Sequence, residues 1–153
     1  MKLKNLTLLL CFSLLALSSH SVNAADSELI DKLNYFEWKN RLILINSPDS
    51  CEHKISKLDN ATDEINDRNI LWFVLCDTSD TTILESNYSQ KANKFAPTLI
   101  DQIRKYYFTT NDTEVVLVGK DGGTKYRSKK LSLKEIFDRV DAMPMRQDEM
   151  RYR

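Results

Sequence analysis

Two uninterrupted apolar runs, Leu42–Ile45 and Ile70–Cys76, most constrain the fold of this chain. A strand with one solvent-exposed face alternates apolar and polar residues, whereas an unbroken run of apolar residues is typical of a strand buried on both faces. The residues between the runs, Cys51–Asp67, place their apolar side chains near helical spacing and predict a helix. Because a strand–helix–strand unit favours parallel pairing through a right-handed crossover, we expect the two runs to be parallel neighbours in a helix-covered sheet.

The C-terminal third of the sequence predicts a hairpin followed by a helix. Val115–Val118 is an apolar run typical of a buried strand, and all three glycines of the chain fall within the five residues after it. Asp-Gly is a strong hairpin signal because a tight turn needs the positive φ that glycine adopts freely. Thr124–Lys129 is the expected return strand. Ser132 and Glu135 then form a capping box that starts a helix, and Pro144 ends it in a fixed C-terminal turn.

The remaining segments complete the order of elements. Ser27–Tyr35 predicts a short helix, Asp77–Lys91 is polar and predicts a loop, and Pro97 opens a helix whose apolar stripe continues to Tyr107. The order is therefore helix, strand, helix, strand, helix, hairpin, helix. Strands that alternate with helices and end in an antiparallel hairpin predict a single α/β domain with a central mixed sheet.

Residues 1–24 are expected to be a secretory signal peptide and not part of the fold. Lys2 and Lys4 precede an apolar stretch, residues 6–17, that is too short to span a bilayer. Small residues then lead to a cleavage site after Ala24 or Ala25. We therefore expect a periplasmic or secreted protein whose single mature domain covers residues 25–153.

The composition of the mature chain narrows the classes of partner. Without the two leader lysines it has 20 basic and 22 acidic residues, a net charge of −2. A nucleic-acid-binding protein is normally clearly basic, so nucleic acid is not an expected partner. No later run is long enough to span a membrane, so no stable insertion is expected after cleavage. The sequence has no Gly-rich phosphate loop, Ser-His-Asp set or metal-ligand cluster, and no cofactor is expected.

Two cysteines remain in the mature chain, Cys51 and Cys76, and export permits a disulfide between them. Cys51 stands where the predicted helix begins, and the partial positive charge of a helix N-terminus favours a thiolate there. Cys76 ends the second buried run, so parallel pairing would bring both cysteines close together. Three interpretations stay open: a structural disulfide, a redox-active Cys51 with or without Cys76 as its resolving partner, and two unlinked thiols. Lys54 stands where a Cys-x-x-Cys pair would have its second cysteine, which excludes that dithiol motif.

Two sets of residues carry weaker signals for a metal. His53 could join both cysteines in a metal site, but it points to a different side of the helix and a fourth ligand is missing. A solvated surface histidine is the favoured interpretation. The methionines of the mature chain, Met143, Met145 and Met150, could bind a soft metal through their thioethers. Flexible apolar contacts between the tail and the core explain them more simply, so no metal is expected.

Three segments of the sequence resemble a known family. Trp38–Ile45 (WKNRLILI), Gly119–Ser128 (GKDGGTKYRS) and Leu131–Arg146 (LSLKEIFDRVDAMPMR) are similar to the bacterial and extracellular animal family labelled "domain of unknown function 4174", also called P-DUDES. That domain also occurs in sushi-repeat-containing extracellular proteins. The resemblance implies a thioredoxin-like, peroxiredoxin-related fold, in which Cys51 stands at the position of the attacking cysteine, and it suggests an oxidoreductase. Pro48 stands where the Thr-x-x-Cys pattern of peroxiredoxins has its threonine, so that pattern is missing.

Two functions are compatible with these features. In the first, the protein is a thiol-dependent oxidoreductase that acts through Cys51 on a thiol or disulfide partner. In the second, it is a non-catalytic protein-binding module with a structural Cys51–Cys76 disulfide or inert thiols. Its partner surface would lie at the Met-Pro-Met-Arg tail or at the basic row of the hairpin, Lys125, Arg127 and Lys129. The simpler interpretation of that row is a charged edge strand that resists edge-to-edge pairing.

Overall fold

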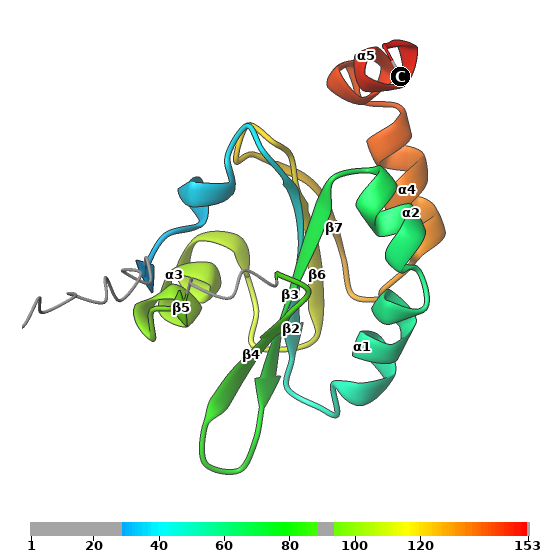
Figure 1. Cartoon of the computed structure of the whole chain (residues 1–153). Coiled ribbons are helices and arrows are strands. Elements are labelled where there is room, and N and C mark those ends of the chain that lie inside the picture. The colour runs from blue at the N-terminus through cyan, green and yellow to red at the C-terminus, as the bar shows by residue number, and fades with distance from the viewer. Residues whose placement is uncertain (1–28, 89–93, 153) are drawn as a thin grey trace, which may run out of the picture.

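A five-stranded mixed sheet forms the centre of the molecule (Figure 1). The computed structural model describes residues 29–88 and 94–152, so the expected signal peptide lies outside the described residues. The strand order is β4-β3-β2-β6-β7. The pair β2–β3 is parallel, and the pairs β3–β4, β2–β6 and β6–β7 are antiparallel. The strands are β2 (Arg41–Ser47), β3 (Ile70–Asp77), β4 (Thr82–Ser86), β6 (Glu114–Val118) and β7 (Thr124–Ser128). This arrangement confirms the α/β fold with a parallel pair and a C-terminal hairpin.

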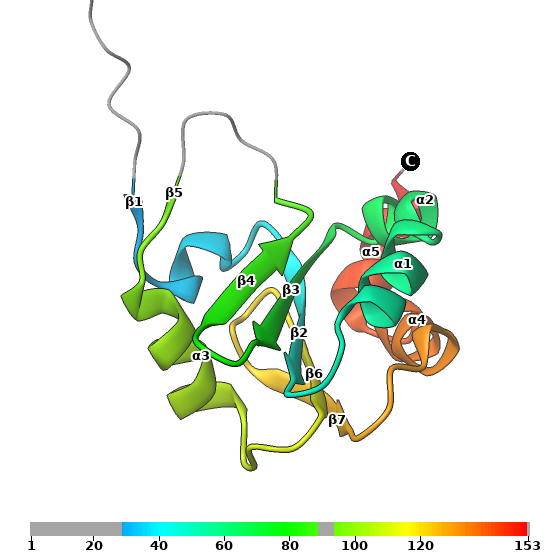
Figure 2. The ribbon, with the colours of Figure 1, turned by 90° about the horizontal axis from the view of Figure 1, so that it is seen from below.

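Helices cover both faces of the sheet, which explains why the central strands are apolar without interruption (Figures 1 and 2). On one face lie α1 (Glu52–Asp59), α2 (Thr62–Asp67) and α4 (Leu133–Asp141); on the other lie α3 (Thr98–Tyr107) and the 3₁₀ helix η1 (Leu33–Phe36). Successive side chains of a strand point to opposite faces. In β2, Ile43 and Ile45 therefore pack under α1 and α4, whereas Leu42 and Leu44 pack under α3.

The helix predicted over Cys51–Asp67 is in fact two helices, α1 and α2. Asn60 caps the end of α1, and the hydroxyl of Thr62 donates a hydrogen bond to the backbone carbonyl of Asp59 at 2.6 Å. A side-chain hydrogen bond to a backbone carbonyl competes with the backbone hydrogen bonds that continue a helix. Leu58 and Ile65 remain buried on either side of the break.

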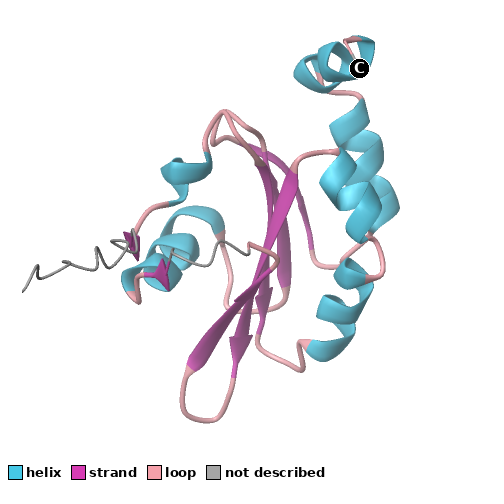
Figure 3. Cartoon of the chain, viewed as in Figure 1, coloured by secondary structure: helices cyan, strands magenta, loops and turns pink. Residues whose placement is uncertain are grey.

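Three further local predictions are corrected by the structure (Figure 3). The described part of Ser27–Tyr35 is a two-residue strand, β1 (Leu29–Ile30), followed by η1, because β1 pairs with β5 (Lys94–Phe95) in a small parallel sheet. The expected loop Asp77–Lys91 contains β4, an edge strand held by its pairing with β3 although its Ile83 is 44% exposed. After Pro144 the chain forms a helix, α5 (Pro144–Arg151), in place of a turn, since proline suits a first helical position.

The turn of the β6–β7 hairpin and the start of α4 follow their sequence signals. Gly122 has a φ of 74°, and the amide of Gly119 donates to the carbonyl of Gly123 at 2.9 Å. The Ser132 hydroxyl accepts a hydrogen bond from the Glu135 amide at 3.4 Å, which forms one half of the capping box. The Glu135 carboxylate instead accepts a hydrogen bond from the Tyr126 hydroxyl, so it ties α4 to β7.

A network of buried arginines attaches α5 to the rest of the molecule. Arg41 on β2 is 1% exposed, and its guanidinium donates to both carboxylate oxygens of Glu149, at 3.1 and 3.2 Å. Lys120, in the hairpin turn, also pairs with Glu149 at 2.7 Å. Arg146 on α5 is similarly enclosed and pairs with Asp67 and Asp141, the last residues of α2 and α4. The C-terminal helix is therefore held mainly by charge-assisted hydrogen bonds.

Replacing Glu149 tests this attachment. In Glu149→Gln the side chain keeps its size, but Arg41 stays buried without a counter-charge. Removing one partner of a buried ion pair costs roughly 3–5 kcal/mol. Because the Glu149 side chain is 23% exposed, we expect a loss of unfolding free energy toward the lower end of that range, measured by urea denaturation. Asp148→Asn is the matched control: among the residues that the structure describes, its exposed side chain pairs only with Arg151 on α5, so its effect should stay within about 0.5 kcal/mol. Equal midpoints for both variants would contradict the network.

The same carboxylate predicts a pH dependence of stability. Burial alone raises the pKa of Glu149, but hydrogen bonds from Lys120 and Arg41 more than offset it, and the pKa lies below its ordinary value of 4.5. A carboxyl whose pKa is depressed by folding contributes its full stability above its unfolded pKa and loses it as the pH falls through the folded pKa. The stability difference between wild type and Glu149→Gln should therefore be constant above about pH 6 and shrink below about pH 4.5. Urea titrations across this range measure it, and a difference that grew on acidification would be inconsistent with the network.

Candidate functional site

Cys51 and Cys76 meet at one end of the central sheet and form a disulfide. The Cα atoms of Cys51 and Cys76 are 5.8 Å apart, and the Sγ atoms are 2.11 Å apart. Cys76 is the penultimate residue of β3, and Cys51 directly precedes α1. The expectation that Cys51 and Cys76 lie close together at neighbouring strand ends is confirmed. Of the three interpretations of Cys51 and Cys76, the one with two unlinked thiols does not apply to this structure.

Strand register explains why these two residues meet. In the parallel β2–β3 pair, Ser47 at the end of β2 lies beside Cys76. The chain then turns back over the sheet in four residues, so that Cys51 lies above the end of β3. Cys76 points to the same face as Ile43 and Ile45, the face that α1 covers. The backbone carbonyl of Cys51 accepts hydrogen bonds from the amides of Lys54 and Ile55, both at 2.9 Å, which places Cys51 at the N-terminal end of the helix.

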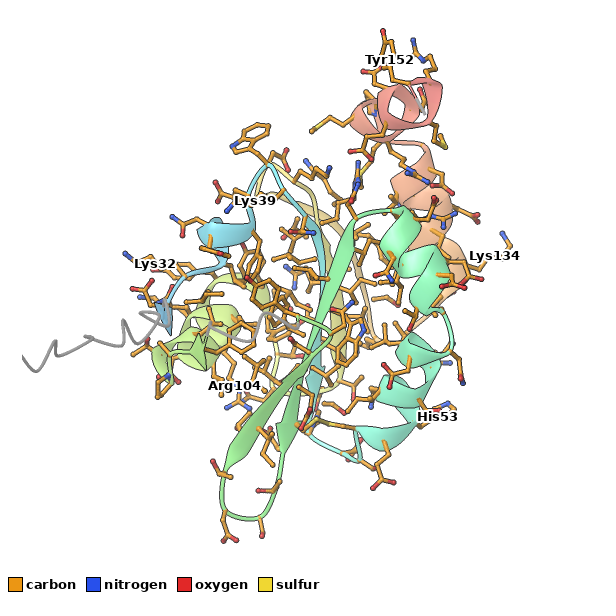
Figure 4. All side chains as sticks on the ribbon, in the orientation of Figure 1. Lys32, Lys39, His53, Arg104, Lys134 and Tyr152 are labelled. Atoms are coloured by element: carbon orange, nitrogen blue, oxygen red, sulfur yellow. A yellow bond between two sulfur atoms is a disulfide. The ribbon has the colours of Figure 1, made fainter. Side chains whose placement is uncertain are left out.

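The disulfide lies at the boundary between the core and the surface. Both cysteines are 9% exposed and belong to the apolar cluster beneath α1 and α4. Their polar neighbours include the Ser47 hydroxyl, which accepts a hydrogen bond from the Lys54 ammonium group at 2.9 Å. His53 is exposed on the outer side of α1 and points away from the sheet, as the surface interpretation predicted (Figure 4).

A buried carboxylate lies along the same edge of the sheet. Glu114, the first residue of β6, is 4% exposed and pairs with Asn46 of β2 across the antiparallel ladder. Burial by itself raises the pKa of Glu114, but hydrogen bonds from the backbone amide of Thr109, the Arg127 guanidinium and the Thr109 hydroxyl bring it below its ordinary value. The Glu114 carboxylate thus holds the loop before β6 through Thr109 and the return strand β7 through Arg127.

The basic row of the hairpin is largely compensated by neighbouring carboxylates. Lys125 pairs with Asp121 at 2.6 Å, and Arg127 pairs with Glu114 and donates to the carbonyl of Tyr107 at 2.5 Å. Only Lys129, just after β7, has no carboxylate partner among the described residues. β7 is an edge strand of the sheet, as the simpler interpretation of the row requires.

The features that suggested a metal do not come together. Within residues 29–88 and 94–152, no group of three or more His, Cys, Asp or Glu side chains could hold a metal ion. Met143 packs against the core below α4, whereas Met145 and Met150 are exposed on α5.

No helix in the described part of the chain is long and apolar enough to cross a membrane.

Sequence reasoning did not identify the polar groups that organise this end of the sheet. The Asn46 amide donates to the backbone carbonyls of Asn111 and Asp112, at 3.0 and 2.9 Å, and so fixes the loop before β6. Ser47 lies between the disulfide and Lys54. The available signal was that the apolar run of β2 ends in two consecutive polar residues, Asn46 and Ser47, which are nonetheless buried.

Comparison with known proteins places the chain in a family and confirms its fold. A family model described as a domain of unknown function (DUF4174) matches residues 32–149. The structure is similar to reduced 2-Cys peroxiredoxin of Plasmodium vivax, with a TM-score of 0.50 and 19% identity, covering 76% of this chain and 72% of that chain. It is also similar to thioredoxin peroxidase I of Plasmodium yoelii, with a TM-score of 0.50 and 20% identity, covering 76% of this chain and 79% of that chain.

No protein of curated function shows significant similarity to this sequence. At identities of 19% and 20%, the likeness to the two solved structures establishes the fold and nothing further. The family model, by contrast, covers most of the chain. The chain therefore belongs to the family described as domain of unknown function DUF4174, and its fold is thioredoxin-like.

Proposed function

We propose that this protein is an exported thiol–disulfide oxidoreductase in which Cys51 is the reactive cysteine and Cys76 its resolving partner. The observation that carries the proposal is the disulfide itself, which joins the start of a helix to the end of the neighbouring parallel strand. Because Cys51 and Cys76 are close enough to bond, they form a dithiol–disulfide pair that can exchange two electrons within one domain. The helix N-terminus at Cys51 favours the thiolate that such a couple needs as nucleophile and leaving group.

The exchange reaction follows from this geometry. A thiolate of a partner dithiol attacks Cys51 Sγ, the Cys51–Cys76 bond breaks, and Cys76 leaves as a thiolate that takes up a proton. The second partner thiolate then attacks the partner's own sulfur in the mixed disulfide, and Cys51 leaves as a thiolate. The partner loses two electrons and two protons and becomes a disulfide, while the cysteine pair gains them. The reverse sequence reduces a partner disulfide and restores the Cys51–Cys76 bond.

Export is part of the proposal because it supplies a compartment in which the couple can be re-oxidised. The expected signal peptide, residues 1–24, would deliver the domain to the periplasm or the extracellular space, where disulfides form and persist. A protein oxidised in that compartment needs a partner that supplies or removes electrons. Protein dithiols and disulfides in the same compartment are that class of partner.

A second candidate function, a non-catalytic binding module with a structural disulfide, is favoured by the burial of both sulfurs. Cys51 and Cys76 are each 9% exposed and form part of the core cluster. The disulfide closes a loop with a sequence separation of 25, for which chain entropy in the unfolded state corresponds to about 3–4 kcal/mol of stabilisation. A bond that acts only as a cross-link would be hard to reduce with cellular thiols.

Single cysteine substitutions separate the two functions. If the proposal is correct, the wild-type protein exchanges its disulfide with a model dithiol peptide, and Cys51→Ser abolishes turnover. Cys76→Ser is tested with the same peptide in its disulfide form. The Cys51 thiolate should attack the peptide disulfide, one peptide sulfur should leave as a thiolate, and the reaction should stop at a mixed disulfide that mass spectrometry detects as one covalent adduct per chain. The asymmetry follows because only Cys51 lies at the helix N-terminus.

The double variant Cys51→Ser/Cys76→Ser is the control for folding. It should retain the circular dichroism spectrum of wild type while losing about 3–4 kcal/mol of stability, the amount expected for the missing cross-link. Wild-type disulfide that resists millimolar glutathione, together with equal adduct formation by both single variants, would refute the oxidoreductase and support the structural cross-link.

A further inference from the structure

A basic hollow lies next to the helix that Cys51 begins. It has a volume of about 300 Å³. Lys54 and Lys57 line it from α1, and Lys129 and Lys130 line it from the segment after β7. Thr113, the residue before β6, lies beside them. The two walls are in direct contact, because the Lys57 ammonium group donates to the backbone carbonyl of Leu131 at 2.8 Å. The hollow is therefore bounded by two segments that are distant in sequence.

The lysines of this hollow form no ion pair with any carboxylate of the described residues. None of the ion pairs among residues 29–88 and 94–152 includes Lys54, Lys57, Lys129 or Lys130. Lys54 and Lys57 donate to neutral oxygens, of the Ser47 side chain and the Leu131 backbone. Lys39 and Lys105 elsewhere on the described surface also lack an ion pair, but the hollow gathers four such lysines around one volume.

The hollow and the disulfide share the first turns of α1. Lys54 and Lys57 lie roughly one and two turns beyond Cys51. Lys54 also contacts Ser47, the residue that lies beside Cys76 in the parallel pair. His53, labelled in Figure 4, lies on the outer surface of α1 and lines the same hollow. A chain bound in the hollow would therefore run past the end of the sheet where the disulfide lies.

We propose that this hollow binds an acidic polypeptide segment of the protein whose cysteines react with Cys51, an inference that rests on the function proposed above. Four lysines from two separate walls present point charges that are spread apart, which suits several carboxylates along an extended chain. A site for a single phosphate more commonly uses the fork of an arginine, and no arginine lines the hollow. The acidic segment places the partner's cysteines at the disulfide by charge complementarity.

Binding of a cysteine-free peptide tests this inference directly. The probe is a fluorescein-labelled hexaglutamate, added to the full protein in its disulfide form at low ionic strength, with binding followed by anisotropy. Lys129→Gln/Lys130→Gln removes two exposed charges that have no ion pair. Two surface charges of this kind should weaken binding roughly three- to tenfold. Lys39→Gln/Lys105→Gln removes the same charge from the opposite side of the sheet and should leave binding unchanged.

The outcomes of the binding experiment are decisive in both directions. Binding that weakens in the first variant alone and fades as salt is added supports the site. Equal affinities in both double variants would overturn it, as would equal binding of a hexaglutamine peptide. Inorganic phosphate that binds the hollow while hexaglutamate does not would show a simple anion site and also overturn the polypeptide assignment.

Exchange kinetics test whether the hollow guides partners to the disulfide, and they let each of the two proposals fail on its own. We expect the protein to oxidise a dithiol peptide flanked by glutamates faster than one flanked by glutamines. Lys129→Gln/Lys130→Gln should remove that preference, whereas the control Lys39→Gln/Lys105→Gln should keep it. Specific hexaglutamate binding without any exchange would overturn the oxidoreductase and leave the acidic-segment site intact. Exchange without charge preference would overturn the site and leave the oxidoreductase intact.

Discussion

The parallel pairing of β2 with β3 is the constraint on which the rest of the structure depends. It aligns Arg41 with Ile70 at one end and Ser47 with Cys76 at the other, so every residue of β2 has a fixed neighbour. Both strands are apolar on both faces and can be stable only under two layers of helices. The same register brings Cys51 above the end of β3. A slip of one residue would turn Cys76 to the opposite face, where α1 could not reach it.

The features that sequence predicts well are those with a strong local pattern. The unbroken runs in β2 and β3, the glycines of the hairpin turn and the serine cap of α4 each identify their element. Because two parallel strands end at the same edge of a sheet, the closeness of Cys51 and Cys76 also follows from sequence. By contrast, β4 contains an exposed isoleucine and depends on pairing with β3, which no window of its own sequence reveals.

The parts that could not be predicted depend on residues that are distant along the chain. Glu149 meets Arg41 across a sequence separation of 108, and no composition or spacing signal connects them. The hollow beside α1 likewise combines Lys54 and Lys57 with Lys129 and Lys130. In the sequence, Lys129 belongs to an alternating basic row on β7. In the structure its two predecessors in that row are neutralised by carboxylates, and only the third contributes to a charged surface.

The buried arginine of β2 has a consequence for the order in which the molecule can be completed. Arg41 is separated from its carboxylate partner Glu149 by 108 positions in the sequence, so nearly the whole domain is made before the pair can form. A guanidinium enclosed in the sheet without that partner would bear the full cost of desolvation. β2 is therefore fully stable only when α5 is in place. A chain that lacked this last helix would keep a guanidinium buried without its charge partner, so α5 completes the folded domain although it packs outside the sheet.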